Sequence, residues 1–128
     1  MENNKTILYV DDDEDDVELL TDAIRGIDPK VTIAIAKNGA EALTYLQSVQ
    51  KLPCLIVLDL NMPYLNGKQT FDKIKADSSL QHIPVIVFSS SANPSDKATF
   101  NSLGIDFITK PHNFSAISEA AIRMLSNC

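Results

Sequence analysis

Five short apolar runs recur along the chain, each rich in β-branched or aromatic residues and each bounded by polar or turn-forming residues. Runs of this kind are typical of buried β-strands. We therefore expect strands over residues 5–10, 31–36, 54–58, 85–88 and 106–109. Because the runs are continuously apolar rather than alternating, both faces of the expected sheet should be covered.

Between these runs, apolar residues recur at spacings of three and four, which is the period of an α-helix. The clearest stripes are Val17, Leu20, Ile24 and Ile27; Ala42, Leu43, Leu46 and Val49; Phe71 and Ile74; and Phe114, Ile117, Ala121, Met124 and Leu125. The pattern predicts helices after the first, second, third and fifth strands.

Local signals mark where several helices begin and end. Asn38 and Glu41 have the spacing of an N-cap and its reciprocal partner. A fourth helix should start around Pro94 and end at Gly104, because proline suits a first helical turn and glycine suits the residue after a helix. We expect Ala98 and Leu103 to be the core contacts of this fourth helix.

Strand and helix therefore alternate five times, which predicts an α/β fold with a mainly parallel sheet and helices on both faces. A doubly wound, flavodoxin-like sheet of five strands in the order 2-1-3-4-5, with five helices, is the expected arrangement. No linker interrupts the pattern, so residues 1–128 are expected to form a single domain without an output domain. A ligand site should lie at the carboxyl ends of the strands.

Composition narrows the class of protein. Hydrophobic residues make up 45% of the 128 residues and charged residues 22%, as in a soluble globular domain. No apolar run is long enough to predict a membrane span, and the first residues do not resemble a secretory signal. The net charge of −6 argues against nucleic-acid binding. The two cysteines, Cys54 and Cys128, lie far apart in the sequence, so we expect no disulfide framework. Cys54 should be a small core residue, and the protein should occupy a reducing, cytoplasmic location.

Polar residues stand at the ends of four expected strands, which the expected sheet order places side by side. They are Asp11 and Asp12, Asp59, Ser89, and Lys110 with Pro111. Three carboxylates brought together repel one another and need a cation. Oxygen ligands with open positions favour Mg²⁺. An ionised aspartate beside Mg²⁺, a hydroxyl and an ammonium is suited to phosphoryl transfer onto the carboxylate.

Other sites that bind phosphate or cations fit the sequence poorly. The chain has no glycine-rich segment ending in Gly-Lys-Ser/Thr, so a P-loop is excluded. The acidic run at residues 11–16 lacks the glycine and the closing glutamate of an EF-hand loop. The same run offers no hydroxyl or glycine donors for a flavin phosphate.

Over its whole length the chain resembles the receiver domain of bacterial two-component response regulators. The matching motifs are Val10-Asp11-Asp12-Asp13, Leu58-Asp59-Leu60-Asn61-Met62-Pro63 with Gly67, Pro84 to Ser89-Ser90, and Lys110-Pro111. Each motif is weak alone, but the four occur in order at the ends of expected strands. The runs Asp59 to Pro63 and Phe88 to Ser91 are also similar to single-domain regulators paired with phytochrome-like kinases.

The resemblance implies a role for each matched residue. Asp59 would be the phosphoacceptor, and Mg²⁺ would be held by Asp12, Asp59, the Asn61 backbone carbonyl and, through water, Asp11. Ser89 and Lys110 would contact the phosphoryl group. Phe107 stands at the position of a switch aromatic that is commonly tyrosine, Pro111 would follow a cis bond, and Gly67 would shape the loop.

The implied function is phosphorelay signalling. A sensor histidine kinase or histidine phosphotransfer protein would be the donor, and a downstream protein would contact helix 4, strand 5 and helix 5; dimerisation on phosphorylation stays open. Such a domain is a phosphoacceptor and not an enzyme. Two alternatives remain: a receiver-like binding module that is never phosphorylated, and a phosphohydrolase with an aspartate nucleophile. The second would need another acid two residues after Asp59, where Asn61 stands.

Overall fold

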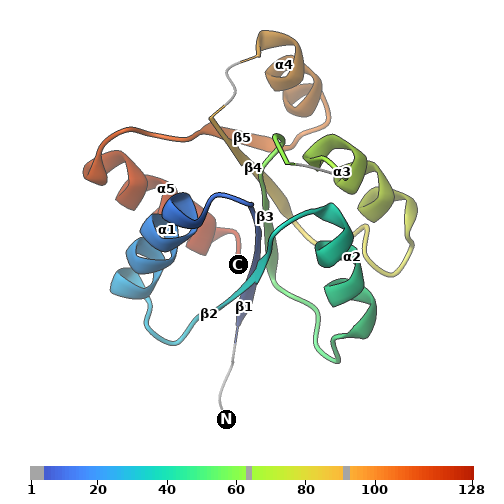
Figure 1. The fold of residues 1–128 in the computed structure, drawn as a ribbon, viewed down its shortest axis with the longest axis horizontal. Coiled ribbons are helices and arrows are strands. Elements are labelled where there is room, and N and C mark those ends of the chain that lie inside the picture. Colours follow the sequence, from blue (N-terminus) through green and yellow to red (C-terminus); the bar gives the residue numbers. More distant parts are fainter. Residues whose placement is uncertain (1–4, 63–64, 91–92) are drawn as a thin grey trace.

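A computed structural model describes residues 5–62, 65–90 and 93–128, and it contains five strands that alternate with five helices (Figure 1). Pro63 and Ser91, which belong to the sequence motifs, lie outside the described residues. The strands are β1 (Thr6–Val10), β2 (Thr32–Ala36), β3 (Leu55–Leu58), β4 (Val85–Ser89) and β5 (Asp106–Thr109). The helices are α1 (Glu14–Ile27), α2 (Gly39–Ser48), α3 (Gly67–Ala76), α4 (Pro94–Ser102) and α5 (Phe114–Ser126).

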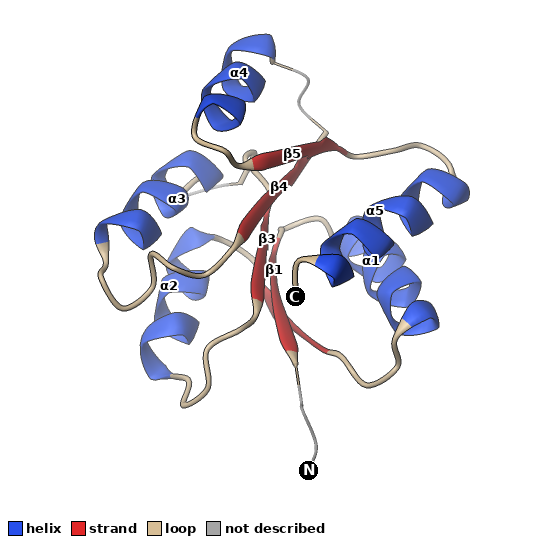
Figure 2. Cartoon of the chain, turned by 180° about the vertical axis from the view of Figure 1, so that it is seen from behind, coloured by secondary structure: helices blue, strands red, loops and turns tan. Residues whose placement is uncertain are grey.

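The strands form one parallel sheet in the order β2-β1-β3-β4-β5, which confirms the predicted fold. Helices α1 and α5 cover one face of the sheet, and α2 and α3 cover the other, with α4 beside β5 (Figures 1 and 2). No helix in the described part of the chain is long and apolar enough to cross a membrane. The order of the strands brings the carboxyl ends of β1, β3, β4 and β5 next to one another.

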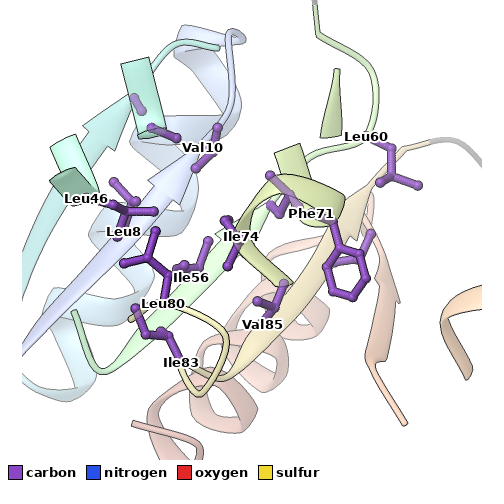
Figure 3. Close-up of a cluster of buried hydrophobic side chains, with 14 of the residues drawn as sticks. Leu8, Val10, Leu46, Ile56, Leu60, Phe71, Ile74, Leu80, Ile83 and Val85 are labelled. Carbon is purple, nitrogen blue, oxygen red and sulfur yellow. The ribbon is translucent and has the colours of Figure 1, made fainter. Parts of the chain in front are cut away.

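The two faces of the sheet bury two separate hydrophobic clusters. Leu8, Val10 and Ile56 point to the α2 and α3 side, where they pack with residues such as Leu46 and Ile74 (Figure 3). Their neighbours in the same strands point to the α1 and α5 side. The continuously apolar strands therefore reflect burial on both faces, as predicted.

The helix ends follow the predicted signals with one correction. Asn38 caps α2 by accepting a hydrogen bond from the Glu41 N–H at 2.9 Å. The Glu41 carboxylate accepts from the N–H of Lys37 instead of Asn38, so the expected reciprocal pair is not formed there. A reciprocal capping box occurs at α3, between Asn66 and Gln69, where it fixes the start of the helix that follows the β3 loop.

Three apolar residues that the sequence predicts to face the core, two from the helical stripes and one from the fourth helix, are exposed. Ile27 is 45% exposed, Leu103 58% and Phe114 71%. Each stands at or just beyond a helix end. Ala98 is exposed as well. The buried contact of α4 is Phe100, whose ring lies 5.1 Å from that of Phe71 and 6.3 Å from that of Phe107.

The expectation that the two cysteines are unpaired is wrong in this structure. Cys54 and Cys128 form a disulfide, with their Cα atoms 4.9 Å apart. Helix α5 runs antiparallel to the strands and returns the end of the chain to the start of β3, so 74 residues of separation in sequence become a direct contact. The pair lies at the amino ends of the strands, away from the acidic residues at the opposite edge.

Candidate functional site

The site begins with two aspartates that continue the sheet beyond the ends of neighbouring strands. Asp11 follows β1, and its N–H donates to the Ala36 carbonyl at 2.9 Å. Asp59 follows β3, and its N–H donates to the Val10 carbonyl at 3.0 Å. Asp11 is 1% exposed and Asp59 4%. The parallel ladder therefore fixes both carboxylates beside each other in a buried position.

A third carboxylate completes an acidic cluster. Oxygen atoms of Asp11, Asp12 and Asp59 all lie within 4.8 Å of one another, and Asp12 is exposed while the other two are buried. Three carboxylate oxygens with one side open to solvent are a donor set that fits a hard divalent cation. The Asn61 N–H donates to Asp59 Oδ1 at 3.4 Å, which holds the loop after β3 against this cluster.

Lys110 brings a positive charge to the cluster from the end of β5. Its N–H donates to the Ser89 carbonyl at 2.9 Å, which extends the pairing of β4 and β5. Its Nζ lies 2.7 Å from Asp11 Oδ2, 2.7 Å from Asp16 Oδ2 and 3.6 Å from Asp59 Oδ2. The ammonium is therefore directly paired with Asp11 and Asp16 and only approaches Asp59.

The electrostatics of the cluster affect its members differently. Burial raises the pKa of Asp59 to about 6; Lys110 opposes this increase, Asp11 adds to it, and hydrogen bonds from the Asn61 N–H and the Ser89 hydroxyl oppose it. Burial alone would lower the pKa of Lys110, but its hydrogen bonds to Asp11 and Asp16 raise it above the usual value. Lys110 therefore stays charged, whereas the Asp59 carboxylate is costly to ionise without a cation.

The side chain of Tyr9 holds one carboxylate of the acidic cluster in place. Its ring is buried, and its hydroxyl donates to Asp11 Oδ2 at 2.8 Å. Burial and the neighbouring Asp11 raise the pKa of Tyr9 above its usual value, so the hydroxyl remains a donor. The Asp13 N–H donates to the other oxygen, Asp11 Oδ1, at 2.9 Å. Asp11 is thus held on both of its oxygens.

Gly67 is required by close packing. A Cβ atom at this position would lie 2.1 Å from the Asp59 carbonyl oxygen and 2.6 Å from the Cα of Leu60. The Gly67 N–H donates to the Leu60 carbonyl at 3.2 Å. The start of α3 can therefore lie directly against the loop that carries Asp59 and Asn61.

The remaining predicted residues occupy the same edge of the sheet. Ser89 is the fully buried last residue of β4, and Phe107 is buried with its ring against Phe100. The expected cis bond before Pro111 is wrong in this structure, because the Lys110–Pro111 peptide bond is trans. The trans form is the intrinsically favoured one even before proline, by about 0.5–1 kcal/mol.

Two residues of the site, Tyr9 and Asp16, were not predicted from the sequence. Tyr9 stands two residues before Asp11, and side chains two apart in a strand share a face, so this spacing was a usable signal. Asp16 lies 94 residues from Lys110 in the chain, and the sequence carries no signal for that pair.

Comparisons with known proteins agree with the geometry. Residues 7–122 match the family model described as the response regulator receiver domain. Response regulator Rcp1 of Synechocystis sp. is 30% identical over 115 residues, which cover 85% of this chain and 78% of Rcp1. A protein-glutamate methylesterase/protein-glutamine glutaminase of Syntrophomonas wolfei is 34% identical over 110 residues, and the match spans only 30% of that longer protein.

Solved structures resemble this one closely. The phosphorylated cyanobacterial phytochrome response regulator RcpA superposes with a TM-score of 0.86 at 30% identity, covering 98% of this chain and 96% of RcpA. The Mn²⁺-bound form of Rcp1 superposes with a TM-score of 0.84 at 28% identity, covering 95% and 92%. Together with the family match over residues 7–122, these similarities show that the chain belongs to the response regulator receiver domain family.

Proposed function

We propose that this protein accepts a phosphoryl group on Asp59 from a phosphohistidine of a sensor histidine kinase or a histidine phosphotransfer protein. The observation that carries the proposal is a buried carboxylate at the centre of four strand ends, within 4.8 Å of two further carboxylates and 3.6 Å from a buried ammonium. A carboxylate that is costly to ionise is stabilised when a cation shares its charge, and an ionised carboxylate beside a cation can act as the nucleophile in phosphoryl transfer.

In the proposed step, an Asp59 carboxylate oxygen attacks the phosphorus atom. The bond from phosphorus to the histidine nitrogen breaks, and its electron pair stays on the imidazole. Lys110 and the Ser89 hydroxyl would hold phosphoryl oxygens, and the hydrogen bonds from the Tyr9 hydroxyl and the Asp13 N–H support this role by keeping Asp11 oriented. Catalysis of this kind depends on positioning and charge neutralisation.

The residues present fit Mg²⁺ at the acidic cluster. Asp12 and Asp59 would be direct ligands with the Asn61 backbone carbonyl, and Asp11 would act through water. When bound, Mg²⁺ neutralises the carboxylates and the phosphoryl oxygens during transfer. Two observations support a need for a divalent cation: three carboxylates lie together, and the raised pKa of Asp59 reflects the cost of its negative charge.

The phosphorylated domain would signal by protein contact rather than act as an enzyme. We place the contact surface for a downstream protein on α4, β5 and α5. Ion pairing between Asp106 and Arg123 joins β5 to α5 on this surface, and Phe100 joins α4 to Phe107. A change in the position of Phe107 would therefore be transmitted to α4.

Intact mass spectrometry tests the function. The protein is incubated with acetyl phosphate and MgCl₂, with EDTA in a parallel sample, as wild type, Asp59→Asn and the exposed control Asp72→Asn. We expect one phosphoryl adduct on the wild type and on Asp72→Asn, none on Asp59→Asn, and none in EDTA.

Each other outcome contradicts the proposal in a different way. An unmodified wild type that still binds Mg²⁺ would indicate a binding module that is never phosphorylated. Continuous release of inorganic phosphate from many phosphate esters would indicate a phosphohydrolase. An adduct that persists in Asp59→Asn would place the phosphoacceptor elsewhere.

A further inference from the structure

Lys110 is held by a carboxylate outside the acidic cluster. Its Nζ is 2.7 Å from both Asp11 and Asp16 but 3.6 Å from Asp59, which is too long for a hydrogen bond. An ammonium group has three N–H donors, and two of them are directed to Asp11 and Asp16. In this state the ammonium is therefore shared between Asp11 of the acidic cluster and Asp16 of α1, and it forms no hydrogen bond to Asp59.

Helix α1 fixes the position from which Asp16 reaches Lys110. Asp16 lies in the first turn of the helix, and its N–H donates to the Asp13 N-cap at 3.1 Å. The neighbouring acids Glu14 and Asp15 are exposed, whereas the Asp16 side chain is 33% exposed. Three acids thus share one helical turn, and Asp16 is the one that forms an ion pair with Lys110.

The pair can also open. Asp16 and Lys110 border a small cavity of about 20 Å³, enough space for one water molecule. Because Asp16 is partly exposed, water can solvate its carboxylate when the ammonium leaves. Asp11 is fully buried and has no such alternative, so the Asp16 contact is the one that Lys110 can release at least cost.

We propose that Asp16 is a positioning residue that holds the Lys110 ammonium away from Asp59 and thereby limits how readily Lys110 engages the phosphoryl group. The inference rests on the proposed phosphorylation of Asp59. Before Lys110 moves closer to Asp59, its attraction to Asp16 must be overcome. Removing the charge of Asp16 should therefore strengthen the interaction of Lys110 with a phosphoryl group on Asp59.

The test uses beryllium fluoride, a phosphoryl mimic, in saturating MgCl₂, with its dissociation constant measured by titration calorimetry. Asp16→Asn removes the ion pair with little change in shape. Asp15→Asn removes the same charge from the same helical turn without touching Lys110, so it controls for the general change in charge. We expect Asp16→Asn to bind the mimic about fivefold more tightly than Asp15→Asn, the size of effect that a partly exposed ion pair can exert.

A double-mutant cycle with Lys110→Met tests whether Asp16 acts through Lys110. The gain from Asp16→Asn should vanish in the Lys110→Met background, which a general effect on helix α1 would not predict. As a second measurement, the rate of phosphoryl uptake from acetyl phosphate should rise in Asp16→Asn relative to Asp15→Asn. Circular dichroism of each variant verifies that it is folded.

The outcomes separate this inference from the function on which it rests. If the wild type neither binds the mimic in Mg²⁺ nor takes up phosphate, both proposals are wrong. If the wild type does both and Asp16→Asn behaves like Asp15→Asn in affinity and uptake rate, the role of Asp16 alone is wrong. A gain that persists without Lys110 would also overturn it.

Discussion

The Asp59→Asn variant should be more stable than the wild type when no divalent cation is present. Burial raises the pKa of Asp59 from 3.8 in the unfolded chain to about 6 in the folded protein. For an acid whose pKa rises on folding, the folded state binds more protons than the unfolded state between the two values, so stability falls as pH increases through this range. The total loss is about 3 kcal/mol above pH 7, and asparagine avoids it.

The same linkage predicts how the difference depends on pH. At pH 7.5 the advantage of Asp59→Asn should approach about 3 kcal/mol. At pH 4.5 the folded protein is protonated at Asp59, while the unfolded chain is still largely ionised, and the advantage should shrink to about 1 kcal/mol. Solvent screens the charge of Asp59 only weakly, because this residue is only 4% exposed.

Urea denaturation in EDTA, followed by circular dichroism at the two pH values, measures this difference directly. The exposed Asp72→Asn variant should show no comparable advantage at either pH. Saturating MgCl₂ should stabilise the wild type more than Asp59→Asn, because the variant has lost one carboxylate of the cluster. The prediction is wrong if Asp59→Asn is less stable than the wild type at pH 7.5. It is also wrong if the gain in free energy of unfolding is the same at both pH values.

Three further variants test how the surrounding structure holds the site. Gly67→Ala should lower the free energy of unfolding by about 2 kcal/mol in urea denaturation, because its Cβ would lie 2.1 Å from a backbone oxygen. The control Gly26→Ala has open space around it and should be neutral or stabilising by up to about 1 kcal/mol. Equal effects of the two substitutions would contradict the close packing at Gly67. Cys128→Ser should lower stability by about 4.5 kcal/mol under non-reducing conditions, the chain-entropy value for a 74-residue separation. A difference that survives in dithiothreitol would not come from the disulfide. Phe100→Ala should cost about 3–5 kcal/mol and increase hydrogen exchange of the α4 amides above that of α2; unchanged exchange in α4 would show that other contacts hold this helix.

Much of the fold follows from the sequence because strands and helices are local, periodic features. Five apolar runs separated by helical stripes are enough to specify parallel strands joined by helices, and the topology rules for such units leave few strand orders. Exposure at the helix ends is less predictable. Ile27, the last residue of α1, and Phe114, the first residue of α5, continue their apolar stripes but are exposed, and a stripe alone does not show whether the terminal turn of a helix is covered.

The same distinction between local features and long-range packing applies to the candidate site. Residues that follow directly from a strand end, such as Asp11, Asp59 and Lys110, are placed by the backbone ladder, and the ladder can be inferred from the apolar runs. Side chains that meet across packed layers cannot be placed in this way. Whether Asp16 reaches Lys110 depends on where α1 begins, how it lies against β5 and which rotamers the two side chains adopt.

The disulfide shows why distance along the chain is a poor guide in a doubly wound fold. Each helix returns the chain to the amino end of the sheet, so residues before β3 and after α5 are brought together although 74 positions separate them. The parallel pairing of β1 and β3 places Asp11 and Asp59, which follow these strands, at the opposite edge, 48 positions apart in sequence but within 4.8 Å in space. One topology thus separates two chemistries: paired cysteines at the amino edge, which can stabilise the fold, and clustered carboxylates at the carboxyl edge, where a buried negative charge reduces stability.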